Sequence, residues 1–456
     1  MGISVGLNSA VRSLLAQQQA MDAVSHNIAN VNTPGYSRQR IHLGAVAPAG
    51  SSGVGQGVEV LSVERVRDLF VDFQIRTQSH SAGDYQARAD SLSLVELAFG
   101  EPSDNGLRAV LGQFFNAWRD LANAPQQSAA RSAVVQAGET LAFVAQRLTR
   151  SMTEIRADAN TRLEASVGEI NELSKQVAAL NQRIIEVRAS GDPASDLTDQ
   201  RDLALDRLSE LIDLTTYEHE DGHVDVFVGG RSLVQGVKTG EIALTINPAN
   251  QNFYDVEWAQ DGAAVVVKSG EVGGLLYQRD TDLPARIADL DTLVAQVITD
   301  VNAVHAAGYA QDGVTTGTAF FTGTGAADVA VNAAVKGDLG LVAAATAAGA
   351  SGDGSGALAI ADLQRATNLT SGSQTYEDYF NGMLTRLGVS VRDAAGIAAA
   401  QGATIQHLEQ LRASVSGVNL DEEMVAMIQF QKGYEAAAKV ISTIDQMLDE
   451  LMAMVG

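Results

Sequence analysis

The chain has 456 residues, 46% of them hydrophobic, which is enough for real hydrophobic cores and suggests two to four domains. Its formal net charge of −24 argues against nucleic-acid binding, because nucleic-acid phosphates would be repelled. The absence of cysteine excludes disulfides, thiolate metal sites and cysteine nucleophiles. Residues 1–19 have no basic leader and no apolar run is long enough for a bilayer, so we expect neither a cleaved signal peptide nor a membrane span.

Near the N-terminus, apolar residues recur in alternating steps of four and three, the 3.5-residue repeat of a helix that packs against another helix. The seam positions are Leu7, Val11, Leu14, Gln18, Met21, Ser25 and Ile28. Turn-forming residues follow, because asparagine tolerates left-handed geometry, proline fixes φ and glycine accepts positive φ. They predict an ordered corner, whose residues are Asn27, Asn30, Asn32, Thr33, Pro34, Gly35 and Tyr36.

Residues 40–43 and 58–66 then alternate as strands do, and residues 68–97 and 106–214 have a helical pattern. A serine-glycine-aspartate-proline run at 190–193 ends one long helix and precedes the next, since glycine and proline together stop a helix. We interpret the apolar stripes of these helices as scaffold.

At Thr215 the hydrophobic period changes from about 3.6 to 2, which predicts strands. We expect them at residues 224–228, 244–246, 253–258 and 264–268, between Gly, Asn and Asp turns. These strands would form a small β-rich domain set on the helical scaffold.

One enzyme motif occurs in this region: His219-Glu220-Asp221-Gly222-His223 fits the H-E-x-x-H pattern of zinc proteases. That chemistry requires a helix, so that two histidines four residues apart share a face. Asp-Gly is instead a strong hairpin turn, and a two-residue turn there would pair Glu220 with His223. No third ligand is evident, so we expect no metal, no cofactor and no catalytic site; a secreted zinc metalloprotease is the distant alternative.

Helical patterns return at residues 270–305, 358–367 and 376–415, and the stretch 306–356 is rich in Gly, Ala and Thr, which predicts a second small insertion or loop. Residues 419–455 then read as one uninterrupted helix with Asn419 as its N-cap, acidic residues in its first turn and Gly433 as a weak point. Its seam positions are Leu420, Met424, Met427, Gln431, Tyr434, Ala438, Ile441, Asp445, Leu448, Met452 and Val455. The two terminal seams fit each other within one chain, or the same helices in neighbouring molecules.

The corner at residues 25–36 resembles the N-terminal signature of the flagellar axial proteins, which are the rod, hook and hook-associated proteins. Residues 418–441 resemble the C-terminal helix of the FlgK family of hook-associated proteins. Three internal stretches resemble the same family, at residues 99–118, 199–202 and 270–276. Since rod and hook proteins share chiefly the two ends, these internal stretches favour the FlgK family over another axial protein of rod or hook, which is the near alternative.

The resemblance implies a structural subunit, not an enzyme, in a ring between the flagellar hook and filament, outside the cell. It implies export in an unfolded state through the flagellar type III apparatus, without a cleaved signal peptide. The implied partners are other copies of the chain, the hook protein, and a second junction protein or the filament side. A cytosolic export chaperone, FlgN in this family, would hold the C-terminal helix.

We therefore expect a mainly α fold with a β insertion, in which helices from both termini form a long antiparallel coiled coil or bundle. The expected parts are a terminal inner-tube domain (1–70 and 415–456), a long-helix bundle (71–214, 270–305 and 357–414), a β-rich outer domain (215–269) and the insertion (306–356). We expect both terminal helices to be poorly ordered in the free monomer. The expected subunit contacts are Leu7, Val11, Leu14, Met21, Ile28, Leu420, Met424, Met427, Tyr434, Ile441, Leu448 and Met452.

Overall fold

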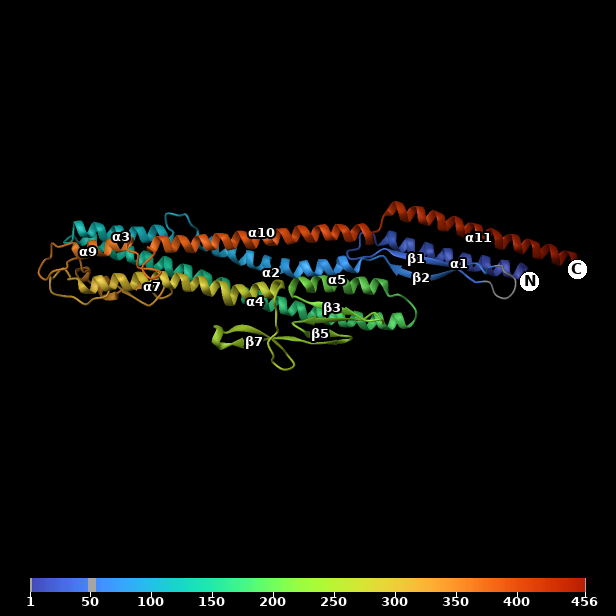
Figure 1. Cartoon of the computed structure of the whole chain (residues 1–456), viewed down its shortest axis with the longest axis horizontal. Coiled ribbons are helices and arrows are strands. Elements are labelled where there is room, and N and C mark those ends of the chain that lie inside the picture. Colours follow the sequence, from blue (N-terminus) through green and yellow to red (C-terminus); the bar gives the residue numbers. More distant parts are fainter. Residues whose placement is uncertain (1, 48–54, 456) are drawn as a thin grey trace.

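The computed structural model describes residues 2–47 and 55–455 as an elongated, mainly helical molecule, in which the first helix begins and the last helix ends at the same tip (Figure 1). The small sheets within the described residues are antiparallel and have two or four strands. The predicted fold class, mainly α with a β insertion, is confirmed. No helix among the described residues is long and apolar enough to cross a membrane.

The terminal helices α1 (Gly2–Ala29) and α11 (Leu420–Val455) lie side by side and antiparallel (Figure 1). Three contacts along their length establish the direction: Gly6 lies against Ile444, Gln17 against Gly433, and Asn27 bonds to Glu423. A hairpin of β1 (Gln39–Ala45) and β2 (Val58–Arg65) packs along α1. The two terminal helices therefore pair with each other within one chain.

A long shaft of helices continues from the terminal pair. Side chains cap its helices as the sequence allows: the Asp68 carboxylate accepts from the backbone N–H groups of Phe70 and Val71, and Thr375 and Asp378 form a capping box. The longest helix has 62 residues and spans about 93 Å at ~1.5 Å per residue. The shaft consists of α2 (Leu69–Phe99), α4 (Ser128–Ala189), α5 (Ser195–Leu211), α6 (Gly270–Tyr277) and α10 (Tyr376–Ser416).

The far end of the shaft has a core of aromatic rings. Trp118 and Phe114 pack against Phe320 and Phe321, which come from the Gly-, Ala- and Thr-rich stretch 306–356. This stretch supplies fully buried side chains, so it is packed against the helices rather than a free loop. The stretch itself contains β9 (Phe321–Thr322), β10 (Ala330–Val331) and α8 (Ala333–Gly337). The other helices at this end are α3 (Leu107–Asn123), α7 (Leu283–Ala307) and α9 (Ser355–Asp362).

The β-rich region begins at Thr215, as predicted, and lies beside α4 and α5 (Figure 1). The predicted strand at 264–268 is wrong. Ala264 makes only an isolated bridge to Glu257, and the Lys268 N–H donates to Asp213, two residues after α5, instead of to a neighbouring strand. The four-stranded sheet is β3 (Thr215–Glu218), β4 (Val224–Val228), β5 (Arg231–Gln235) and β6 (Lys238–Thr239), and the two-stranded sheet is β7 (Ile242–Asn247) and β8 (Phe253–Trp258).

Candidate assembly site at the terminal helix pair

The face of α1 that is buried within the chain is built from small side chains. Ala10, Ala16, Ala20 and Val24 are all buried. On α11 the matching close approach is at Gly433, where a Cβ atom would lie 2.8 Å from Cδ of Gln17. Gly433, predicted as a weak point in the helix, is therefore the position at which α11 makes room for α1.

The predicted seam residues lie beside this face rather than in its centre. Leu7, Leu14, Met21 and Ile28 of α1 are half-buried and Val11 is exposed. On α11, Met427, Tyr434 and Ile441 are half-buried, whereas Leu420, Met424, Leu448 and Met452 are exposed. The spacing of the seam predicts that its large side chains contact a partner helix. In the structure α1 and α11 contact each other through smaller side chains and leave the larger ones outside.

These outward-facing side chains form what we term the outer stripe. Met452 is 76% exposed and Met424 is 56% exposed, although both are large and apolar. Large apolar side chains left exposed in this number on one helix mark an interaction surface. The members of the outer stripe are Leu420, Met424, Val425, Ile428, Val440, Met447, Leu448, Leu451, Met452 and Met454.

Asn27 of the signature corner holds the base of the helix pair together. It is 1% exposed, and its Nδ2 donates to the Gln39 carbonyl at 2.9 Å and to Glu423 Oε2 at 3.0 Å. Its Oδ1 accepts from the Tyr36 hydroxyl at 2.7 Å and the Gln39 N–H at 2.9 Å. All four hydrogen-bonding positions of the amide are thereby used. Burial, with nearby carboxylates, raises the pKa of Tyr36 and keeps its hydroxyl a donor.

The other signature residues shape the bend itself. The Asn30 side chain bonds to the His26 carbonyl and accepts from the Thr33 hydroxyl. Gly35 has φ of +77°, which favours glycine. Asn32, Thr33, Pro34 and Gly35 are exposed, so this part of the signature is a surface bend, whereas the buried Asn27 and the half-buried Tyr36 form its base.

Glu423 of α11 has a buried role that its place in the first turn of a helix does not predict. It was expected only to favour the helix N-terminus, but it is 2% exposed and its Oε1 lies 2.6 Å from Nε of Arg38. Arg38 also pairs with Glu422 at 2.8 Å, and its N–H donates to the Ser416 carbonyl at the end of α10. Arg38 thus connects the corner with the link between α10 and α11. Arg38 and Glu423 are almost 400 positions apart in the chain, so no local sequence pattern marks their ion pair.

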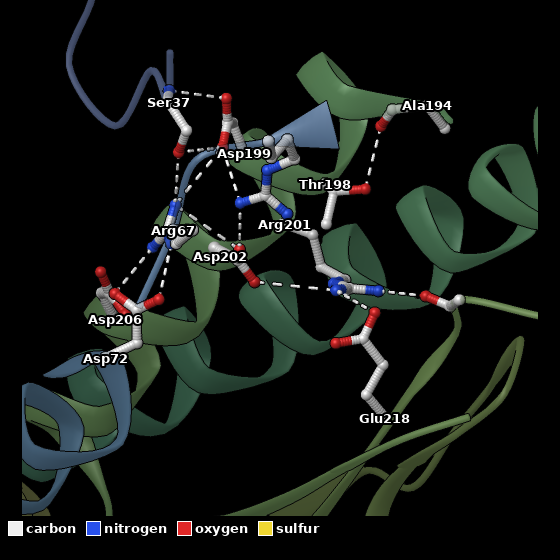
Figure 2. Close-up of polar contacts among 12 residues, drawn as sticks. Ser37, Arg67, Asp72, Ala194, Thr198, Asp199, Arg201, Asp202, Asp206 and Glu218 are labelled. Atoms are coloured by element: carbon white, nitrogen blue, oxygen red, sulfur yellow. Dashed lines mark hydrogen bonds and ion pairs between the residues drawn. The ribbon is translucent and has the colours of Figure 1, made fainter. Parts of the chain in front are cut away.

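A second buried cluster, which we term the joint, fixes the terminal pair to the shaft (Figure 2). Asp199 of α5 accepts from the Ser37 N–H at 2.9 Å and the Ser37 hydroxyl at 2.7 Å. The same region of α5 binds arginines from β2, the following loop and α2. The ion pairs are Arg65 with Asp199 and Asp202, Arg67 with Asp72 and Asp199, Arg76 with Asp206, and Arg412 of α10 with Asp206.

Burial alone would raise the pKa of Asp202, but Arg67, Arg65 and the other arginines around it outweigh burial and lower its pKa to about 2. For Asp199 burial dominates and raises the pKa, although Arg65 and Ser37 oppose it. Arg201 reaches from the joint toward Glu218 of β3 (Figure 2): its Nη2 lies 3.6 Å from Glu218 Oε1, and its Nη1 donates to the Gly222 carbonyl. Residues 199–202, quoted above for their resemblance, are therefore where the terminal pair, the shaft and the β-rich region meet.

The H-E-x-x-H stretch lies in the turn between β3 and β4, as its Asp-Gly pair predicted, so the helical protease geometry is not formed. The predicted pairing of Glu220 with His223 is wrong. The His219 N–H donates to the His223 carbonyl at 2.9 Å, because the loop has three residues, with Gly222 at φ of +92°. The expectation that no third ligand lies nearby is also wrong, since Asp225 Oδ2 lies 3.1 Å from His219 Nε2.

Comparison with known proteins tests the resemblance. Residues 92–321 match the family described as flagellar hook-associated protein FlgK helical domain. The chain belongs to the FlgK family. Its ends match two further families, described as flagella basal body rod protein at residues 7–36 and flagellar basal body rod FlgEFG protein C-terminal at residues 410–454.

Whole-length relatives agree with this assignment. The chain is 30% identical to flagellar hook-associated protein 1 of Bacillus subtilis (strain 168), over 99% of this chain and 98% of that protein. It is 25% identical to the protein of the same name from Escherichia coli (strain K12), over 98% and 99% of the two chains. The solved structure of the flagellar hook junction protein FlgK from Burkholderia pseudomallei has a TM-score of 0.65 and 15% identity, covers 75% of this chain and all of that one, and supports the fold.

FlgK-family membership confirms the resemblance stated from the sequence and decides against a rod or hook protein, because the internal match is to the FlgK helical domain. The relatives are structural flagellar proteins, and the findings support a structural role for this chain at the junction between the flagellar hook and filament.

Proposed function

We propose that the chain is a non-enzymatic structural subunit that packs side by side with other copies through its terminal helix pair, in a ring between hook and filament. The observation that carries this proposal is the outer stripe. Because α1 and α11 cover each other with small side chains, the large apolar residues of α11 remain available to a neighbouring subunit. Fully burying an exposed Leu or Met side chain contributes about 1.5–3 kcal/mol, and the outer-stripe residues, which are already partly covered, contribute a share of this. A few such contacts repeated around a ring stabilise it.

We further propose that the parts of the chain have separate roles. Residues 1–70 and 415–456 would form the inner tube, the shaft would form the layer around it, and the β-rich region would face outward. The joint supports this division, since its buried ion pairs hold the terminal pair in one orientation on the shaft. A subunit between two assemblies of different mechanical character needs such a fixed connection.

The proposed neighbours are other copies of the chain, the hook protein on one side, and a second junction protein or the filament on the other. The outer stripe would also require cover before assembly, which supports binding of α11 by a cytosolic export chaperone of the FlgN type. Export would proceed through the flagellar type III apparatus without cleavage of the N-terminus. The place of action would then be the extracellular flagellum.

The test is complementation of a strain that lacks the gene, with M424K/I428K placed in the outer stripe. Lysine is a good helix former and both positions are more than half exposed, so α11 itself should stay folded. We expect the variant to be secreted into the medium but not retained on hooks, with flagellin lost to the medium. L94K/L97K on α2 is the matched control, because it also replaces two exposed leucines on a helix.

The control should restore filaments. Filaments of normal number with M424K/I428K would overturn the role of the outer stripe, and normal filaments in the strain without the gene would overturn the junction role as a whole.

A further inference from the structure

The β3–β4 hairpin brings two histidines face to face. His219 and His223 are opposite each other across the turn, with ring centroids 4.0 Å apart and planes 17° from parallel. Successive side chains of a strand alternate between the faces of a sheet, so Asp225, two residues after His223, lies on the same face. A helix would have placed the histidines one turn apart; the hairpin places them closer, with a carboxylate between their Nε2 atoms.

Both imidazoles present the same nitrogen to that carboxylate. His219 Nε2 lies 3.1 Å from Asp225 Oδ2, and His223 Nε2 lies 3.8 Å from Asp225 Oδ1. Among residues 2–47 and 55–455, these three form the one group of histidines and acids whose ligand atoms all lie within 4.8 Å of one another. We propose that His219, His223 and Asp225 bind a divalent transition-metal ion of the Zn²⁺ class.

The tautomer of His223 suits this role. Its Nδ1 lies 2.6 Å from Asp221 Oδ1, and an Nδ1–H donated to that carboxylate leaves the lone pair of Nε2 free for a metal. Carboxylates that accept from the outer nitrogen of a ligating histidine are the usual support of metal sites. The two carboxylate oxygens of Asp225 also have separate partners. Its Oδ1 accepts from the Gly236 N–H at 2.6 Å, and its Oδ2 faces His219.

The scaffold under the hairpin is rigid. Asn181 of α4 is fully buried and its amide accepts from the Val224 N–H and donates to the carbonyls of Val224 and Gly236. Arg201 of the joint donates to the Gly222 carbonyl at the turn. Two of the candidate ligands, His219 and His223, flank the β3–β4 turn, and Asp225 lies on β4. Asn181 and Arg201 bond the backbone next to them to the shaft, at Gly222, Val224 and Gly236, so a site of this kind needs little ordering when the ion enters.

The ligand set selects the metal. Two imidazole nitrogens and one carboxylate oxygen suit Zn²⁺ and its neighbours, whereas Mg²⁺ and Ca²⁺ prefer oxygen ligands. With metal–ligand bonds of about 2.0–2.2 Å, two ligand atoms of one tetrahedral ion lie about 3.3–3.6 Å apart, so small rotations of the rings complete the site. His219 and His223 are partly exposed, which leaves a fourth position for water. The ion would join β3 to β4, a role separate from the packing of the terminal helices.

Isothermal titration of the full chain with ZnCl2 tests the proposal. We expect saturable binding at one ion per chain, weakened at least about 10-fold in H219Q and in H223Q, and about 10–100-fold in D221N through loss of the supporting carboxylate. H407Q is the matched control, because His407 is exposed on α10 away from the hairpin. Circular dichroism checks that each variant is folded, and MgCl2 should give no saturable binding.

Absence of saturable zinc binding to the parent chain would overturn the proposal, as would unchanged binding in both H219Q and H223Q. Neither result bears on the outer stripe, whose test is the retention of subunits on hooks.

Discussion

Asp202 carries the most heavily compensated charge of the joint, and replacing it by asparagine removes the charge while keeping the shape. Its Oδ2 lies 2.7 Å from Arg65 Nη2, with Arg67, Arg76 and Arg201 also within ion-pair distance. The difference between its ordinary pKa of 3.8 and about 2, at about 1.36 kcal/mol per pH unit, corresponds to roughly 2.4 kcal/mol. Uncompensated buried arginines add to this, so D202N should lose about 3–5 kcal/mol of unfolding free energy at neutral pH.

Urea unfolding followed by circular dichroism measures this loss. Because the folded-state pKa is below the unfolded one, the stabilisation by Asp202 is fully present above pH 4 and declines as the pH falls from about 3.8 toward 2. The difference between D202N and the parent should therefore be constant from pH 8 to 5. D261N is the matched control, since Asp261 also pairs with an arginine, Arg231 at 3.0 Å, but at the surface. A loss below about 1 kcal/mol in D202N, or an equal loss in D261N, would refute the reasoning.

Two further predictions follow from the folded chain. Burial lowers the pKa of His305 to about 4, so the folded state requires the neutral ring. The free energy of unfolding should therefore fall by on the order of 3 kcal/mol as the pH drops from 6.5 to 4. Urea unfolding across this range should show a fall that H305Q lacks, and equal pH dependence in the two proteins would contradict the prediction. Hydrogen exchange of the free monomer should show weak protection at residues 1–30 and 420–456, because each terminal helix is short of partners before assembly and covers the other on one face only; full protection there would contradict the prediction.

Short-range rules predicted much of the fold. Asn419 caps α11 as expected, its Oδ1 accepting from the Asp421 N–H at 3.0 Å, and α4 ends at Ala189, directly before the predicted glycine-proline stop. The change of period at Thr215 marks the start of β3. Each of these features depends on residues within a few positions of one another, so the sequence contains the whole interaction. The pairing of the terminal helices was also foreseeable, because two apolar seams needed cover.

The candidate sites were predicted less completely, and for a physical reason. Asn27 was identified as part of a signature, but its contact with Glu423 and that of Ser37 with Asp199 join residues far apart in the chain. The helices α1 and α11 meet at Ala20 and Gly433 rather than at the predicted seam. Which residues meet depends on how closely the two helices approach each other. Whether Asp225 lies beside the two histidines depended on whether the β3–β4 turn has two residues or three.

The sequence by itself determined the helices, the strands after Thr215, the terminal seams and the resemblance to the FlgK family, since periodicity, caps and turn residues act locally. Tertiary structure alone decided which side of each terminal helix is covered, which carboxylates Arg38, Arg65 and Arg67 bind, and that His219 meets His223. Those outcomes are set by the docking of segments distant in sequence, and a buried ion pair or a cross-strand pair has no period that marks it along the chain.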